Sequence, residues 1–259
     1  MYKEDISGRV AFISGASAGI GEATAKALAS NGVNLILTAR RIDKLENLKN
    51  SFEKKYKVKV KIIKIDFSKS EEIVNALNSL EGEWKNIDIL INNAGLALNK
   101  DVYSNNLLED VLQMIRVNCE GLITATRILL PFILKSEHGH IINIASTAAD
   151  EAYSGGAIYC ATKSFVEMFG DALRIELIDK PVKVTNIKPG LVNTEFSTVR
   201  FKGDKEKADN VYKGLEPLLA EDIADNIEYV LTRKSHVQIS SMTIMAENQA
   251  TATMAYRKQ

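Results

Sequence analysis

The chain has 259 residues, of which 33 are lysine or arginine and 33 are aspartate or glutamate, so its formal net charge is zero. This balance argues against a dedicated nucleic-acid binder, which normally carries a basic surplus or patch. A hydrophobic fraction of 46% is ordinary for a soluble globular protein, and the length allows one large α/β domain or two small ones.

The cysteine content and the apolar runs bear on the compartment. Cys119 and Cys160 are the two cysteines of the sequence, too few for a disulfide framework. The first five residues carry three charges and no apolar segment, so no signal peptide is visible, and no apolar run approaches the roughly 20 residues that span a bilayer. We therefore expect a cytoplasmic protein with neither membrane nor nucleic-acid partners.

Metal binding is not expected from the histidine content. The sequence holds three histidines, and two of them form the segment His138-Gly139-His140 before an apolar run. This segment is typical of a surface turn rather than of a ligand set.

Short apolar runs alternate with longer helical stretches along the chain. Such alternation favours parallel strands joined by right-handed helical crossovers. Lys alternates with Val or Ile over 58–65, which indicates a strand near one sheet edge. The expected strands are 10–14, 33–38, 58–65, 87–91, 140–145, 182–187 and 237–245, and the expected helices are 20–30, 42–56, 70–80, 106–117, 121–134, 159–178 and 220–232.

These elements predict a single doubly wound α/β domain over 1–259, with a parallel sheet of about seven strands and helices on both faces. No linker, repeat or low-complexity segment divides the chain. The stretch 190–219 is about 30 residues of charged, irregular sequence. Loops of that length are usually functional, so we predict a mobile substrate loop there.

A glycine-rich turn follows the first predicted strand, with the spacing G-x-x-x-G-x-G at Gly15, Gly19 and Gly21. Gly15 permits a tight turn, Gly19 allows the backbone to approach a phosphate, and Gly21 lets the next helix lie close to the strand. The helix N-terminus then offers free N–H groups to a pyrophosphate. In the first βαβ unit, this pattern predicts a dinucleotide site rather than a plain strand-to-helix turn.

The end of the second strand distinguishes the two nicotinamide cofactors. An acidic residue there would bind the ribose hydroxyls of NAD, but this chain has Arg40 and Arg41. Planar guanidinium groups match the oxygens of a 2′-phosphate, so NADP is favoured over NAD. The alternative is that both arginines simply begin a solvated basic helix.

A second set of polar residues is predicted at the carboxyl ends of later strands. Tyr159 and Lys163 lie four residues apart and share one helix face, where the lysine charge would lower the tyrosine pKa toward the range useful for proton transfer. Ser146 follows a strand and points toward the crevice where ligands bind in such folds. Asn118 interrupts an apolar helical stretch, which is awkward for an amide without a partner.

Taken together, these motifs resemble the short-chain dehydrogenase/reductase family in order and spacing over essentially the whole chain. The matching positions are Ser14-Gly15, Gly19, Gly21, Asn92-Asn93-Ala94-Gly95, Asn118, Ser146, Tyr159, Lys163 and Pro189-Gly190. The stretch 189–204, with 219–224 and 248–250, resembles the narrower group of NADP-dependent 3-hydroxy acid dehydrogenases, which includes enzymes that oxidise serine and L-allo-threonine.

The resemblance implies a Rossmann-type fold and a role for each matching position. Tyr159 would be the general acid/base, Lys163 would lower its pKa and bind the nicotinamide ribose, Ser146 would polarise the substrate oxygen, and Asn118 would hold a water of a proton relay. The cofactor contacts would be Gly15, Ser17, Gly19, Ile20 and Gly21 at the pyrophosphate, Arg40 and Arg41 at the 2′-phosphate, Asp66 and Phe67 at the adenine, Asn93, Ala94 and Gly95 at the adenosine ribose, and Pro189, Gly190, Val192 and Thr194 at the nicotinamide.

Two arginines are weighed as further contacts. Arg127 stands in an otherwise apolar helix and would reach the cofactor or lie at the surface. Arg200 lies in the predicted loop and would clamp a substrate carboxylate with bidentate hydrogen bonds, unless it is a solvated loop residue.

The resulting hypothesis is hydride transfer between NADP and the 3-hydroxyl carbon of a small hydroxy acid such as serine, L-allo-threonine or 3-hydroxyisobutyrate. An NADPH-dependent reductase of neutral ketones or dicarbonyls is the alternative, and a nucleotide-binding regulator without catalysis is a third possibility. The relatives are commonly tetramers, so the resemblance also implies a homotetramer formed through the helices of 106–134 and 159–178.

Overall fold

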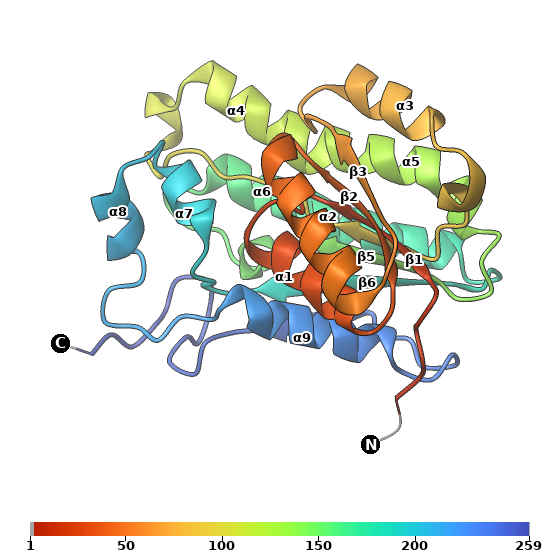
Figure 1. Ribbon diagram of the computed structural model, residues 1–259. Coiled ribbons are helices and arrows are strands. Elements are labelled where there is room, and N and C mark those ends of the chain that lie inside the picture. Colours follow the sequence, from red (N-terminus) through yellow and green to blue (C-terminus); the bar gives the residue numbers. More distant parts are fainter. Residues whose placement is uncertain (1–2, 259) are drawn as a thin grey trace.

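The computed structural model describes residues 3–258, so residues 1, 2 and 259 of the predicted domain lie outside the described range. Within it, seven strands form one parallel sheet in the order β3-β2-β1-β4-β5-β6-β7 (Figure 1). The strands are β1 (Val10–Ser14), β2 (Asn34–Ala39), β3 (Val60–Lys64), β4 (Ile89–Asn92), β5 (Gly139–Ile144), β6 (Val182–Pro189) and β7 (Ser241–Ile244).

Helices cover both faces of this sheet. On one face, α1 (Gly19–Ser30), α2 (Ile42–Tyr56) and α9 (Ala220–Leu231) pack against the sheet and form one hydrophobic core with it. The core on the other face is covered by α3 (Ser70–Asn78), α4 (Leu108–Ile115), α5 (Leu122–Ile133) and α6 (Ala157–Glu176). Helices α3, α4 and α5 lie along the top of Figure 1. This arrangement confirms the predicted doubly wound fold.

The interior strand β1 shows why the strands are continuous apolar runs. Ala11 and Ile13 pack into the core beneath α1, α2 and α9, whereas Val10 and Phe12 pack into the core on the other face. A strand that is buried on both faces has apolar side chains on both, so its sequence is a continuous apolar run rather than an alternating one, as in most parallel sheets. The edge strand β3 is less buried, and its position at the end of the sheet confirms the prediction made from its lysines.

The stretch 190–219 is more ordered than its sequence predicts. It holds two short helices, α7 (Glu195–Arg200) and α8 (Lys205–Asn210). The Thr194 hydroxyl accepts a hydrogen bond from the Phe196 N–H, and the Asp204 carboxylate accepts one from the Lys207 N–H. These side-chain N-caps stabilise helices that are too short to show a hydrophobic period, which is why the prediction of irregular structure was wrong.

Three other local predictions need correction. The helix expected over 106–117 is α4, which ends at Ile115 and continues into α5 through a π-helical turn, η3 (Arg116–Gly121). His140 lies inside β5 and is buried, with its ring Nε2 2.9 Å from the Thr185 hydroxyl, so it is not part of a surface turn. The final strand is also shorter than predicted, because only Ser241–Ile244 pairs with β6.

No helix within residues 3–258 has the length and apolarity needed to cross a bilayer. In the same range, no three His, Cys, Asp or Glu side chains are grouped so that they could hold a metal ion.

Candidate active site

A cavity of about 760 Å³ opens at the carboxyl ends of the strands. Its walls come from the segments that directly follow β1 to β6, so the parallel sheet brings residues distant in sequence to one edge. Most of the predicted site residues line it, namely Gly15, Ser17, Gly19, Ile20, Arg40, Arg41, Asp66, Phe67, Asn93, Ala94, Gly95, Ser146, Tyr159, Lys163, Pro189, Gly190, Val192, Thr194 and Arg200.

In the glycine-rich turn between β1 and α1, each glycine stands where a side chain would strain the backbone or collide with a neighbouring residue. Gly15 and Gly19 have φ angles of +68° and +55°, a region that side chains disfavour. A Cβ on Gly21 would lie 2.4 Å from the Gly15 carbonyl oxygen and 2.5 Å from Nδ2 of Asn93. The absence of a side chain at Gly21 therefore lets α1 pack against the turn, as the sequence predicts. Gly21 itself is not among the residues that line the cavity.

The segment after β4 is tied to the same turn. The Asn93 amide donates to the carbonyl oxygens of Ser14, at 2.8 Å, and Gly15, at 3.2 Å. The Ser14 hydroxyl in turn accepts hydrogen bonds from the backbone N–H groups of Asn93 and Ala94. This exchange fixes the glycine turn and the Asn-Asn-Ala-Gly segment as one rigid wall of the cavity.

The two arginines after β2 are placed differently. Arg40 is exposed at the cavity and lies near Asp66. Burial raises the pKa of Asp66, but hydrogen bonds from Ser68 and the charges of Arg40 and Lys69 outweigh it, so the net pKa lies below its ordinary value. Arg40 thus offers a guanidinium at the end of β2 without a paired carboxylate among the described residues.

Arg41 is already engaged by protein groups. It donates to the Glu195 carboxylate at 2.7 Å and to the Ser17 hydroxyl at 3.2 Å. Lys44 of α2 binds the other Glu195 oxygen at 2.9 Å. Hydrogen bonds from Lys44 and Arg41 hold the pKa of Glu195 below its usual range. Glu195 begins α7, so this pairing, which the sequence analysis missed, joins the cofactor-specificity segment to the predicted substrate loop.

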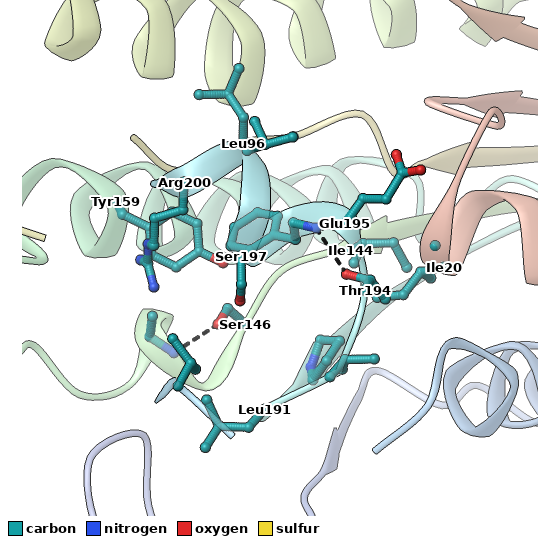
Figure 2. A pocket seen from close by; sticks show the side chains of 18 of the residues that line it. Ile20, Leu96, Ile144, Ser146, Tyr159, Leu191, Thr194, Glu195, Ser197 and Arg200 are labelled. Carbon is teal, nitrogen blue, oxygen red and sulfur yellow. Dashed lines mark hydrogen bonds between the residues drawn. The ribbon is translucent and has the colours of Figure 1, made fainter. Parts of the chain in front are cut away.

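Tyr159 and Lys163 lie one helical turn apart near the start of α6, as predicted. The Lys163 ammonium is buried, donates to the Ile144 carbonyl oxygen at 2.7 Å, and lies 5.9 Å from the Tyr159 ring centre. Burial lowers the pKa of Lys163 to about 8. Ser146 begins the short turn after β5, and its hydroxyl oxygen accepts the Ala148 N–H (Figure 2).

The predicted electrostatics of Tyr159 are wrong in one respect. Burial raises the pKa of Tyr159 to about 12, although the charge of Arg200 and a hydrogen bond with Ser146 act in the lowering direction. The Lys163 ammonium, which donates to the Ile144 carbonyl oxygen, does not overcome this effect of burial. The structure therefore presents Tyr159 as a neutral phenol, which is a proton donor at neutral pH.

Asn118 lies behind the cavity wall in the π-helical turn η3. Its Nδ2 donates to the Leu96 carbonyl oxygen at 2.8 Å and to the Thr162 hydroxyl at 3.0 Å, while its Oδ1 accepts the Leu96 N–H at 2.8 Å. A Cβ on Gly95 would lie 3.4 Å from Asn118 Oδ1 and 3.5 Å from Lys163 Nζ. Asn118 thus ties the segment after β4 to α6, beside the Lys163 ammonium.

Arg127 is not brought to the site. It lies on α5 with an exposed side chain and is not among the residues that line the cavity. The helix buries its apolar face and leaves Arg127 in solvent, so the surface alternative describes it and the predicted cofactor contact has no support in the structure.

Helix α7 brings Arg200 close to Tyr159. Arg200 lies beside Tyr159 in Figure 2, and its guanidinium is 5.0 Å from the Tyr159 ring centre. Its NH2 donates to the Tyr153 hydroxyl at 2.9 Å. Phe196 of the same helix lies against Tyr159, with ring centres 5.8 Å apart. The Nε of Arg200 is buried and has no hydrogen-bond partner. The sequence analysis missed Tyr153 and Phe196, since no motif marks either residue.

The C-terminal segment also lines the cavity, from 249 to 257. The Gln249 side chain accepts the Leu191 N–H at 2.8 Å. Thr253 donates to the Glu151 carboxylate at 2.5 Å, and Arg257 donates to the carbonyl oxygens of Val211 and Lys213. These contacts place the tail over the site and against the segment after α8.

Comparison with known proteins agrees with this geometry. The short chain dehydrogenase family model matches residues 9–205. An NADP-dependent 3-hydroxy acid dehydrogenase of Schizosaccharomyces pombe is 44% identical over 98% of both chains, and one of Escherichia coli K12 is 40% identical over 96% of this chain and 100% of the relative.

Solved structures give the same picture. The closed form of a serine dehydrogenase complexed with NADP+ superimposes with a TM-score of 0.88 at 40% identity, covering 96% of this chain and 100% of the other. An alcohol dehydrogenase of Thermococcus sibiricus complexed with 5-hydroxy-NADP has a TM-score of 0.82 at 27% identity, covering 93% and 98%. The chain belongs to the short chain dehydrogenase family.

Proposed function

We propose that the protein is an NADP-dependent dehydrogenase of small 3-hydroxy acids. The observation that carries the substrate class is Arg200, whose guanidinium lies 5.0 Å from the Tyr159 ring centre and has a buried Nε without a partner. A carboxylate two carbons from the reacting hydroxyl would reach this group, because carboxylates match the guanidinium fork. Relatives at 40–44% identity with NADP-dependent 3-hydroxy acid dehydrogenase names support the same substrate class.

The residues present fit the cofactor. The close contact between Gly21 and Gly15 leaves the α1 N-terminus open to a pyrophosphate, since no side chain caps that helix. Arg40 would bind the 2′-phosphate, and Asp66 and Phe67 would flank the adenine at the end of β3. When bound, NADP supplies the nicotinamide carbon that accepts or returns the hydride.

The chain's own groups would move the proton. Tyr159 would donate its phenolic proton to the carbonyl oxygen in reduction and accept the hydroxyl proton in oxidation. Ser146 would hold the same oxygen by its hydroxyl, next to Tyr159. Lys163, buried and charged below its pKa of about 8, would stabilise the phenolate and bind the nicotinamide ribose. Asn118 would fix the wall beside the Lys163 ammonium, where a relay water would reach it.

The two other hypotheses have less support. A reductase of neutral ketones or dicarbonyls gives no role to the Arg200 guanidinium at the reacting end. A regulator without catalysis does not account for Ser146, Tyr159 and Lys163 facing one cavity.

An NADPH absorbance assay with the purified protein tests the proposal. We expect turnover of L-serine, L-allo-threonine and 3-hydroxyisobutyrate with NADP+, and slower reaction with neutral alcohols and ketones of similar size. Tyr159→Phe is expected to lose at least about 10³-fold in kcat, because the proton donor is removed, while NADPH binding persists. Faster turnover of neutral ketones than of any hydroxy acid would assign the alternative activity instead.

The assembly and compartment are part of the same proposal. Apolar side chains stand exposed on the two predicted subunit faces: Leu107, Leu108, Ile115 and Ile123 on one, and Phe165, Met168, Ile175 and Ile178 on the other. Exposed apolar faces of this kind are usually buried between copies of a chain, which supports a homotetramer. Sedimentation measures the oligomeric state. The free thiols of Cys119 and Cys160 fit the reducing cytoplasm, which fluorescence imaging of a tagged protein tests.

A further inference from the structure

The substrate end of the cavity gathers positive charge without balancing carboxylates. Lys100, Arg200 and Arg257 all line it. None of the three has a carboxylate within ion-pair distance among residues 3–258. Of the other cations of the lining, Arg41 pairs with Glu195 and Lys207 with Asp204, whereas Arg40 and Lys163 have no carboxylate within ion-pair distance among the same residues. Arg200 and Arg257 both act electrostatically on Lys100, so these three unpaired charges lie near one another.

Tyr153 contacts two of these cations. Its hydroxyl accepts the hydrogen bond from Arg200 NH2 at 2.9 Å, and the Lys100 ammonium lies 5.8 Å from its ring centre. Among residues 3–258, no hydrogen bond or ion pair engages the Lys100 ammonium, so it lies near the ring with its hydrogen-bond donors available. Arg200 and Lys100 thus both contact Tyr153 at the wall of one cavity.

The three charges also act on one another. Burial lowers the pKa of Lys100, and the charges of Arg200 and Arg257 lower it further. Arg257 is fixed in the tail by hydrogen bonds to the Lys213 and Val211 carbonyl oxygens, which leave its positive charge in place. Such mutual repulsion is relieved by an anion, and one carboxylate bound at Arg200 leaves the charge of Lys100 unmatched.

We propose that Lys100 is a specificity-determining residue that selects 3-hydroxy acids with a second anionic group, such as 3-hydroxydicarboxylates. The proposal rests on the function proposed above: Arg200 binds the carboxylate two carbons from the reacting hydroxyl. Lys100, an exposed residue of the cavity lining whose charge is near those of Arg200 and Arg257, binds the second. In the oxidation of 3-hydroxyglutarate, the C3–H bond breaks and its hydride passes to NADP+. The hydroxyl proton leaves through Tyr159, giving 3-oxoglutarate, NADPH and a proton.

A matched pair of substrates isolates the second charge. 3-Hydroxyglutarate and its monoamide have nearly the same shape but differ by one negative charge. We expect kcat/KM to be about tenfold higher for the dianion at low salt, as for a partly exposed ion pair at short range. The ratio is expected to fall toward one as salt screens the pair.

Variants assign the effect to Lys100. Lys100→Met keeps the length of the side chain and is expected to lower the dianion-to-monoamide ratio about fivefold or more, while Lys100→Arg restores most of it. Lys85→Met removes the same charge from an exposed residue outside the cavity lining and serves as the control. NADPH binding and the melting temperature verify that each variant is folded.

The outcomes separate the two proposals. Equal kcat/KM for dianion and monoamide in the wild type, with both oxidised, overturns the selection of a second anion and leaves the proposed function intact. An unchanged ratio in Lys100→Met removes Lys100 from the assignment. Failure to oxidise L-serine, 3-hydroxyisobutyrate and both glutarates with NADP+ overturns the proposed function itself.

Discussion

The guanidinium of Arg200 lies 5.0 Å from the centre of the Tyr159 ring, so the loop after β6 carries a positive charge to the residue proposed to transfer the substrate proton. One side chain thereby influences both substrate binding and proton transfer. It provides a partner for a carboxylate, and its charge acts to lower the pKa of Tyr159 against the larger effect of burial.

Replacing Arg200 should therefore have two separable effects. In Arg200→Gln, kcat/KM for 3-hydroxy acids is expected to fall about 100-fold, because a charge-assisted bidentate contact is lost. Reduction of neutral ketones should fall much less. The pH profile of oxidation should also move to higher pH, since burial of Tyr159 is then less opposed. Arg116→Gln, which replaces a half-buried arginine that is paired with Glu109 outside the cavity lining, is the control. A uniform loss for acids and ketones would contradict the carboxylate role.

The pKa of Tyr159, about 12, predicts opposite pH dependences for the two directions of reaction. Below that pKa the phenol is protonated, so proton donation to a carbonyl oxygen is available at neutral pH. Oxidation requires the phenolate, whose fraction rises about tenfold per pH unit below the pKa. We expect kcat/KM for oxidation to rise from about pH 7 to about pH 10, and that for reduction to stay level or fall.

Initial rates in both directions measure these profiles, with chemistry confirmed as the slow step by a deuterated substrate. Ser146→Ala removes a hydrogen bond that lowers the pKa of Tyr159, so its oxidation profile should lie at still higher pH. An oxidation rate that is flat over this range would show that bound NADP and substrate bring the pKa of Tyr159 to a much lower value.

How far the sequence predicts the site depends on how local each feature is. The glycine turn and the Tyr159–Lys163 pair are set by neighbours within one turn of chain, and the structure has both as predicted. The Arg41–Glu195 pair joins residues 154 apart in sequence, and no motif in either segment predicts that contact. Arg127 shows the same limit, because an isolated charge in an apolar stretch does not reveal whether its helix face is covered.

The fold was more predictable than the electrostatics. Apolar runs buried on both faces, such as β1, identify parallel strands without any knowledge of their partners. The pKa of Tyr159 depends on burial by elements such as α7, which the sequence analysis treated as irregular loop. Desolvation is a property of the assembled site, so the direction expected from Lys163 alone was wrong.

The Glu195 contact predicts how the two arginines share cofactor recognition. Arg40→Gln should weaken NADPH binding about 100-fold and leave NADH binding nearly unchanged, because a phosphate loses its charged partner. Glu195→Gln should strengthen NADPH binding severalfold, because Arg41 is released from a carboxylate 2.7 Å away. Fluorescence titration with NADPH and NADH measures both effects.

Glu46→Gln, which removes an exposed acid from the same helix as Lys44, is the control for general charge effects. If Glu195→Gln weakens NADPH binding while Glu46→Gln does not, Glu195 orients Arg41 for the phosphate instead of competing with it.

His140 predicts that stability depends on pH. It lies near the amino-terminal end of β5, at the opposite end of the strand from the cavity. Burial lowers the pKa of His140 to about 3, and its ring Nε2 lies 2.9 Å from the Thr185 hydroxyl. An unfolded histidine has a pKa of about 6.5, so between these values the unfolded chain binds a proton that the folded chain does not. The contribution of His140 to stability is therefore present above about pH 6.5 and is lost as the pH falls toward 3.

At pH 5 this difference amounts to about 2 kcal/mol of the free energy of unfolding. Urea unfolding at about pH 7 and about pH 5 should therefore show a larger loss in the wild type than in His140→Gln, by about that amount. His138→Gln, which replaces an exposed histidine two residues earlier, should lose stability with falling pH as the wild type does. Equal losses in the wild type and His140→Gln would mean that the buried ring accepts a proton in the folded state, with Thr185 or water accommodating the charge.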